Sequence, residues 1–207
     1  PGLSPSGEEV LLYHDNTLVD SIRWGRQIAG HSIGRHGPSG QWKLCLPTPG
    51  GPNQAVGLAP PHQMKINEWL SDSELHYLGE FIELFNPGDS PANVGGLWLS
   101  NSLDHPGRHQ IPDHSYIPAH GFLVFHSTAS DRPAADEFPF NLDDFRQWLV
   151  LTADNGATID QIRITSQHPD AVEGRNPDGS PNVETLPLGT PGRSNNRPPV
   201  FTRFPLC

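Results

Sequence analysis

The chain has 207 residues and a formal net charge of −10, with 13 Lys and Arg against 23 Asp and Glu. This charge disfavours binding to a nucleic-acid backbone, which needs a basic surface that displaces counterions. Only 34% of the residues are hydrophobic, whereas Gly and Pro number 21 and 23. Frequent turns with few apolar residues are typical of an all-β chain of short strands, so we expect no long helices.

The cysteines and apolar runs indicate neither covalent cross-links nor membrane insertion. Cys45 and Cys207 lie far apart, with the spacing of neither a disulfide framework nor a zinc site. No apolar run approaches the roughly 20 residues that cross a bilayer, so we predict no membrane insertion. The chain begins at Pro1 without an initiator Met or a signal peptide, and we interpret it as an internal fragment of a larger protein.

The first element in chain order is a strand, turn and strand that recurs near the C-terminal end. Residues 10–13 (VLLY) lead through a DN turn to residues 18–24, and residues 149–152 (LVLT) lead through a DNG turn to residues 158–164. Asp20 recurs 140 positions later (160 − 20) as Asp160. Asp-Asn and Asn-Gly pairs tolerate the left-handed backbone of hairpin turns. Alternating apolar residues at 22, 24, 162 and 164 predict half-buried antiparallel strands.

The segments that follow each hairpin also match. Gly34-Arg35 recurs as Gly174-Arg175, and Thr48-Pro49-Gly50 recurs 142 positions later (190 − 48) as residues 190–192. Because they are rich in Gly and Pro, residues 34–40 and 174–179 are predicted to be turns. The stretch from residue 66 to 145 has no counterpart in the first copy. We therefore predict that residues 1–53 are the closing half of a truncated domain.

This repeat divides the chain into four predicted parts. Residues 1–53 form the truncated first domain, 54–63 a Pro/Gly-rich linker, 64–195 a complete domain, and 196–207 a linker to a further module. In the complete domain we expect strands at residues 65–70, 80–85, 97–100, 121–126, 147–152 and 158–164. Short strands with regular turns over about 130 residues favour a β-sandwich. Residues 1–53 cannot close a sandwich alone, so we expect them to be mobile, docked on the complete copy, or paired between chains.

Five segments of the complete copy, taken in order, carry a family resemblance. They are residues 66–68 (INE), 80–88 (EFIELFNPG), 96–99 (GLWL), 117–124 (IPAHGFLV) and 174–179 (GRNPDG). Each is common alone, but the ordered set resembles the lamin tail domain of the bacterial extracellular type. One departure is Leu97, which stands where the family usually has Trp, with Trp98 displaced by one position.

The resemblance implies an immunoglobulin-like β-sandwich without catalytic activity. It also implies a structural or interaction module of a larger extracellular or cell-surface protein, whose partners are other domains of the same polypeptide or cell-surface proteins. The alternative is an accessory domain that binds nucleic acid or glycan for a secreted nuclease or other hydrolase. We predict no small-molecule ligand, and nucleic acid is the less favoured alternative because of the negative charge.

The sequence contains no residue pattern that is specific for catalysis. Glu80 and Glu83 are three apart in a predicted strand, which places them on opposite faces rather than together for acid/base chemistry. Glu68 and Glu83 are interpreted as structural, binding backbone amides or pairing with Arg108 or Arg163. There is no Gly-x-Ser-x-Gly elbow, and a Ser after a His at 126–127 is adjacency alone. We predict no catalytic residue and no enzyme.

Metal and carbohydrate sites are also weighed against simpler explanations. The histidines form no tight ligand motif, so no cofactor and no metal site is predicted; they include His31, His36, His105, His109, His114, His120 and His126. Calcium stays open as a minor possibility through oxygen ligands of two turns, which contain Asp154, Asn155, Asp160 and Asp178, although Asp-Asn-Gly is explained by turn chemistry. Most tryptophans fit a sandwich core, but Trp42 and Trp69 stay open as carbohydrate-binding positions.

Overall fold

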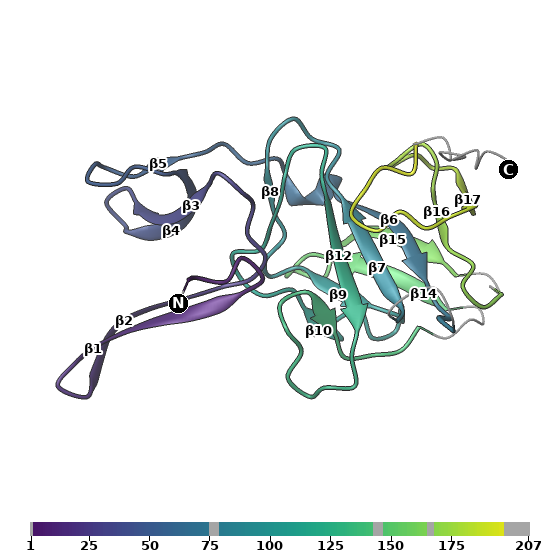
Figure 1. Ribbon diagram of the computed structural model, residues 1–207, viewed down its shortest axis with the longest axis horizontal. Helices are drawn as coiled ribbons and strands as arrows, with labels where there is room; N and C mark the ends of the chain where they lie inside the picture. Colours follow the sequence, from purple (N-terminus) through teal and green to yellow (C-terminus); the bar gives the residue numbers. More distant parts are fainter. Residues whose placement is uncertain (1, 75–78, 143–146, 165–167, 197–207) are drawn as a thin grey trace, which may run out of the picture.

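The computed structural model describes residues 2–74, 79–142, 147–164 and 168–196. It is all-β apart from one short 3₁₀ turn, η1 (Pro61–Gln63), which confirms the predicted fold class. Figure 1 shows a layered sandwich and, beside it, an N-terminal unit from which a long hairpin projects. Among the described residues no helix is long and apolar enough to cross a membrane. Residues 197–207 of the linker predicted at 196–207, with Cys207, lie outside the described residues.

One face of the sandwich is a sheet with the strand order β13-β12-β7-β6-β16-β17. Its strands are β6 (Lys65–Leu70), β7 (Phe81–Phe85), β12 (Phe122–Ser127), β13 (Glu137–Phe138), β16 (Glu173–Arg175) and β17 (Val183–Thr185). The central strands β6 and β7 are buried almost throughout, because one side faces the core and the other is covered by the C-terminal loops. Their antiparallel register places Glu68 opposite Glu83.

The other face is a sheet with the order β10-β9-β14-β15. It contains β9 (Trp98–Ser100), β10 (His109–Gln110), β14 (Trp148–Thr152) and β15 (Thr158–Arg163), and a small pair, β8 (Ala92–Asn93) with β11 (Tyr116–Ile117), lies at one end. Apolar side chains from both sheets form the core, including Ile66, Trp69, Leu84, Leu99, Phe125 and Leu151. Burial of this apolar surface is the dominant favourable contribution to folding.

The N-terminal unit contains two separate antiparallel pieces. The hairpin of β1 (Glu8–His14) and β2 (Thr17–Trp24) forms one, and β3 (Ser32–His36), β4 (Gln41–Leu46) and β5 (Gln54–Ala55) form the other. Asp15 and Asn16 both have positive φ, as the predicted hairpin turn requires. Every residue of β1 is exposed, in contrast to the strands of the sandwich.

The six strands predicted for the complete copy are found to within one residue at each end, as β6, β7, β9, β12, β14 and β15. The sequence does not predict the shorter strands β8, β10, β11, β13, β16 and β17. The turns predicted at residues 34–40 and 174–179 are only partly correct, because Gly34-Arg35 lies in β3 and Gly174-Arg175 lies in β16. A Cβ on Gly174 would lie 2.9 Å from Leu186 and 3.0 Å from the Asn67 carbonyl oxygen. Glycine is therefore used here for close packing of strands rather than for a turn. Residues 54–63, predicted as a linker, contain β5 and η1.

Candidate interaction surface

The two hairpins have the same internal pairing. In β1–β2, Glu8 pairs with Trp24, and the register shifts between Leu12 and Tyr13. In β14–β15 the register shifts at the corresponding place, between Leu151 and Thr152. The N-terminal hairpin therefore repeats the structure as well as the sequence of the later one.

The polar contacts behind the hairpins are repeated too. Nη2 of Arg35 donates to Asp20 at 2.6 Å, and Nη2 of Arg175 donates to Asp160 at 3.0 Å. Nη1 of Arg35 donates to the Gly40 carbonyl oxygen at 2.9 Å, as Arg175 does to Ser180. The corresponding residues of the two copies thus form the same network, and one copy lies in a closed sandwich while the other does not.

An asparagine closes each network. The Asn53 amide donates to the Arg35 carbonyl oxygen at 2.8 Å, and the Asn195 amide donates to the Arg175 carbonyl oxygen at 2.9 Å. Each asparagine side-chain oxygen accepts from a threonine hydroxyl, of Thr48 in the first copy and Thr190 in the second. The turns that follow each hairpin are thereby fixed in the same way.

In the complete copy, β6 and β7 add further contacts to this network. Glu68 accepts the Thr190 amide at 2.7 Å, and its second carboxyl oxygen lies 2.9 Å from the Thr190 hydroxyl oxygen. Glu83 accepts the Gly192 amide at 2.7 Å and the Asn67 side-chain amide at 3.0 Å. The prediction that both carboxylates bind backbone amides is confirmed. Their predicted pairing with Arg108 or Arg163 is wrong, because Arg108 donates to Asn101 and Arg163 is exposed.

Burial strongly perturbs both carboxyl groups. Loss of solvent raises the pKa of Glu83 to about 9, although the hydrogen bonds from Asn67 and Gly192 act in the opposite direction. Loss of solvent also raises the pKa of Glu68 to about 7. Both side chains are fully buried and are held by the loop at 190–195 and by Asn67. The pair therefore fastens the C-terminal loop to the sheet.

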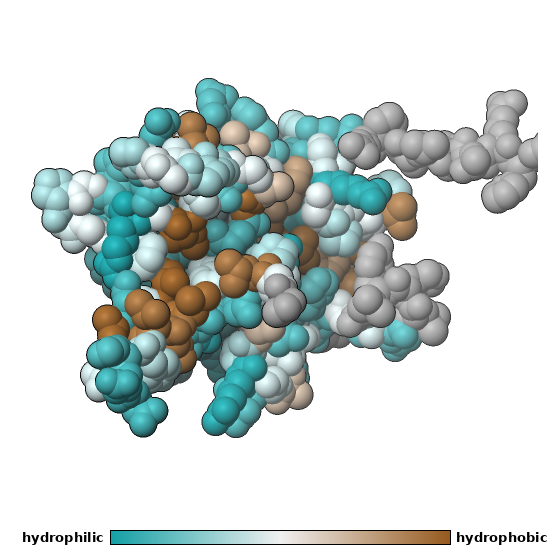
Figure 2. All heavy atoms as spheres, turned by 60° about the vertical axis from the view of Figure 1, so that its left-hand side comes forward, coloured by the Kyte–Doolittle hydropathy of each residue, from teal (hydrophilic) through white to brown (hydrophobic). Residues whose placement is uncertain are grey.

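The N-terminal unit lacks this cover. An apolar groove of about 690 Å³ opens between the hairpin and β3–β4, and its lining includes Val10, Ile22, Trp24, Ile28, Ile33 and Trp42. Side chains of β1 and β2 are also exposed, with Leu12 at 58% and Val19 at 58%. Figure 2 brings this side of the molecule forward and shows hydrophobic patches on it. Such an exposed apolar surface indicates an interaction site.

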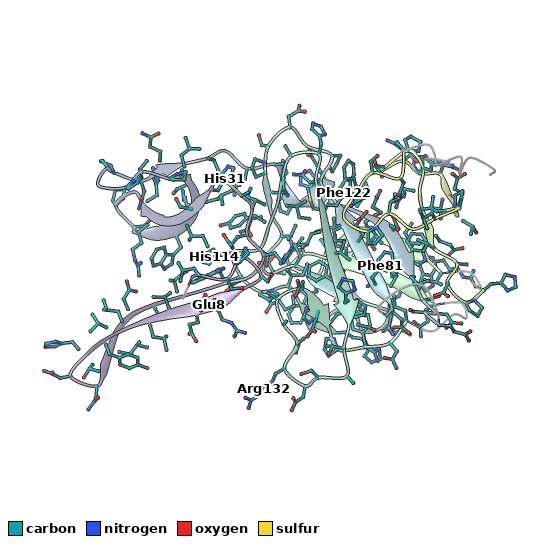
Figure 3. The ribbon with its side chains drawn as sticks, viewed as in Figure 1. Glu8, His31, Phe81, His114, Phe122 and Arg132 are labelled. Atoms are coloured by element: carbon teal, nitrogen blue, oxygen red, sulfur yellow. The ribbon has the colours of Figure 1, made fainter. Side chains whose placement is uncertain are left out.

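A short strap, residues 25–27, joins the N-terminal unit to the sandwich. The Gly25 amide donates to the Asp113 carbonyl oxygen at 2.9 Å, and the Tyr116 amide donates to the Arg26 carbonyl oxygen at 2.8 Å. The Gln27 side chain donates to the His114 carbonyl oxygen at 2.6 Å. Figure 3 shows His114 at this junction, between Glu8 on the hairpin and His31 on the second piece. Of the predicted alternatives for residues 1–53, docking on the complete copy is the one observed.

Comparison with known protein families assigns most of the sandwich to one family. Residues 59–166 match the family profile of the Lamin Tail Domain. The chain belongs to the lamin tail domain family. This family is a non-enzymatic, immunoglobulin-like interaction domain, and the match confirms the predicted resemblance at the level of the family. Among curated proteins none matches the chain. Residues 1–58, with the groove and the strap, lie outside the family match.

The residues weighed as catalytic groups are dispersed over the lamin tail domain. Glu83 lies under the C-terminal loop, whereas Glu80 precedes β7 and accepts the Leu142 amide at 2.7 Å. His126 is exposed and its ring lies 6.5 Å from that of Phe81. His109 is buried, and burial lowers its pKa, so its ring is neutral at neutral pH.

Three of the four turn residues considered for calcium make other contacts, whereas Asp154 is exposed. Asp160 pairs with Arg175, Asp178 accepts from the Asn195 amide at 3.0 Å, and Asn155 accepts from the Ala157 amide at 3.0 Å. Within the described residues no three His, Cys, Asp or Glu side chains are grouped to hold a metal ion. The prediction of no cofactor, and calcium as the alternative left open, both stay untested.

Of the two tryptophans considered for carbohydrate binding, Trp69 is fully buried and donates to Glu173 at 3.1 Å. Trp42 lines the groove and stacks under Arg35, whose guanidinium lies 4.3 Å from the ring centroid. Sequence reasoning missed the strap at Gly25, Arg26 and Gln27. The only signal was that the first copy continues past Trp24 with polar residues, which gives no indication of where they bind.

Proposed function

We propose that the chain is a non-catalytic connector in which lamin tail units are held in a fixed tandem arrangement within a larger secreted or cell-surface protein. The observation that carries this proposal is the strap of residues 25–27. It hydrogen-bonds through its own backbone to the loop that precedes β11. Backbone bonds of this kind fix the orientation of the two units, unlike a flexible Gly/Ser linker.

Contacts on both sides of β3–β5 support a rigid joint. Upstream of this piece, Arg26 lies 3.3 Å from Asp136 and donates to Ser6 at 2.6 Å. Downstream, the Ala59 amide donates to the Pro91 carbonyl oxygen at 2.8 Å, and Ala59 forms a parallel bridge with Ala92. The N-terminal unit is therefore attached to the sandwich at two separate points of the chain. Two attachments restrict rotation about either one.

The fit of the strap is close. A Cβ on Gly25 would lie 1.9 Å from the Ser115 hydroxyl oxygen and 3.1 Å from Pro112. Ser115 is fully buried and its hydroxyl donates to the Pro112 carbonyl oxygen at 2.7 Å, so it cannot simply move aside. The loop thus accepts a strand with no side chain at this position. Neighbouring domains of the same polypeptide are the partners that such a connector would hold in place.

Substitution of Gly25 by Val tests the connector. We expect G25V to separate the strap from the loop while both units keep their strands, because the added side chain overlaps Ser115. The measurement is ¹⁵N relaxation of amides in residues 8–55 and 60–140. In the unmodified chain both groups report one correlation time, and in G25V the N-terminal unit tumbles faster.

Gly57→Val is the matched control, since Gly57 has open space around its Cβ position and no positive φ. Independent tumbling of the two units in the unmodified chain contradicts the proposal. Tight retention of DNA or a glycan by the unmodified chain contradicts it as well, and supports the accessory substrate-binding role instead.

A further inference from the structure

In the complete copy, strands β9 and β6 occupy the position that corresponds to the groove of the N-terminal unit. There, β14 pairs with β9 on the edge away from β15, through Leu151 opposite Leu99. Likewise β16 pairs with β6, through Gly174 opposite Glu68. In the first copy, β1 pairs only with β2, and β3 is the edge strand of its sheet in the described part of the chain. Both free edges border the space where equivalents of β9 and β6 belong.

Polar groups on the first copy match the missing strands as well. In the complete copy the Ile66 amide donates to Asp160 at 2.9 Å, and Arg175 donates from Nε to the Ile66 carbonyl oxygen at 2.8 Å. Asp20 and Arg35 present the same two groups at the edge of the first copy, and no β6-like strand meets them among the described residues. Asp20 and Arg35 can therefore bind the backbone amide and carbonyl of one residue in an added strand.

Thr48 and Gly50 indicate which polar side chains the occupant carries. Their counterparts Thr190 and Gly192 donate backbone amides to Glu68 and Glu83. Within the described residues no carboxylate takes these positions at Thr48 and Gly50. A strand pair with a glutamate on each strand, opposite one another as in β6 and β7, would satisfy both amides.

We propose that the groove is filled by the opening half of a further lamin tail domain, a strand pair of the β6–β7 type with two opposed glutamates, supplied by the same polypeptide on the N-terminal side of β1. The order of elements argues for this source, because β6, β7 and β9 all precede β14 in the complete copy. Alternating apolar side chains of these strands cover Val10, Ile33 and Trp42 and complete the second core. The inference rests on the tandem arrangement of the proposed function.

A fusion tests the occupant directly. A second copy of residues 59–139 is placed before Pro1, which continues the 139-position offset between β14 and β1 (149 − 10). Hydrogen exchange is followed at residues 10–13 and at Ile33. We expect exchange there to slow by about 100-fold relative to the unfused chain, because strand pairing and burial replace free edges.

Matched variants keep the test decisive. Changing Glu68 and Glu83 to Ala in the added copy alone removes most of the protection, while the original copy is unaffected. In a second fusion, Trp24→Ile and Ile33→Glu give the first copy the residues that the complete copy has at the corresponding positions, Ile164 and Glu173. This variant excludes a poor fit of these two side chains against the added strands.

Exchange at residues 10–13 that stays fast in both fusions overturns the proposal. So does concentration-dependent dimerisation of the unfused chain that protects the same residues, since a second copy would then fill the groove. Neither outcome depends on the relaxation test of the strap, which uses the unfused chain at low concentration.

Discussion

Two hairpins of this chain repeat one another in pairing and differ in what covers them. Leu12 of β1 is 58% exposed, and Leu151, its counterpart in β14, is fully buried. Both hairpins have the same register shift next to the turn. Turn chemistry and alternation are local properties, so they form with or without a sandwich. Burial depends on β9 and β6, which are distant in the sequence and which, in the part of the chain that the structure describes, cover one hairpin only.

The same difference applies to the two arginine–aspartate pairs. The side chains of Arg175 and Asp160 are 7% and 10% exposed, whereas those of Arg35 and Asp20 are 46% and 42% exposed. A buried charge that loses its partner is costly, whereas an exposed pair contributes about 0–1 kcal/mol. Loss of the arginine should therefore destabilise the chain much more in the buried Arg175–Asp160 pair than in the exposed Arg35–Asp20 pair, although the two pairs have the same geometry.

The largest effect is expected from removal of the buried arginine. Arg175→Met takes the closest cation away from the buried Asp160, which keeps the Ile66 amide and Lys65 at 3.8 Å. It also removes the hydrogen bonds from Arg175 to the Ile66 and Ser180 carbonyl oxygens, and we expect the free energy of unfolding to fall by about 3–5 kcal/mol. Arg35→Met, the matched change, should cost less than about 1 kcal/mol because water replaces the guanidinium. Urea denaturation followed by tryptophan fluorescence measures both. Equal losses in the two variants would show that the network has the same role in each copy.

A second pair of variants compares the apolar residues. Leu151→Ala should destabilise the sandwich by roughly 2–5 kcal/mol, because it removes core contacts and leaves a cavity. Leu12→Ala should change the unfolding free energy by less than about 1 kcal/mol, because that side chain is already in contact with water. Denaturation midpoints give the two values. A large loss from L12A would contradict an open N-terminal hairpin.

The smallest expected effect is a change in pH dependence. The pKa of Glu83 is raised from 4.5 to about 9, so the native state keeps a proton that the unfolded chain releases. Stability from this group is fully present below pH 4.5 and is lost as the pH rises through about 9. Between pH 6 and 8 we expect a decline of about 2 kcal/mol, at no more than about 1.4 kcal/mol per pH unit.

Glu83→Gln provides the control for this pH dependence. Its amide does not titrate, so the decline between pH 6 and 8 should become smaller than in the unmodified chain. At pH 6 the E83Q variant should be less stable than the unmodified chain. Either the Asn67 or the Gly192 N–H donor then faces the NH₂ group of the new glutamine and loses its acceptor. Unfolding free energies of the two proteins at both pH values give the comparison. The same slope in both proteins would mean that Glu83 titrates as a solvated carboxyl does.

Strand positions were predictable because alternation and turn residues are local signals. The sequence predicts turns at Gly34 and Gly174, because a Gly-Arg pair near Pro is typical of a turn, whereas strand pairing places both glycines in β3 and β16. Pairing of Arg175 with Asp160 and of Glu83 with Gly192 joins residues brought together only by the sheet order, which one sequence does not specify. The strap at Gly25 could not be predicted either, because the loop that it binds lies about 90 residues further along the chain.

The central claim is that the missing partner strands, and not the hairpin sequence, make β1 exposed. Hydrogen–deuterium exchange of the monomeric 207-residue chain tests it most directly, by comparing residues 10–13 with residues 149–152. The account predicts that residues 149–152 exchange only through global unfolding, and that residues 10–13 exchange about 100-fold faster or more through local opening. Equal protection of the two segments would contradict it.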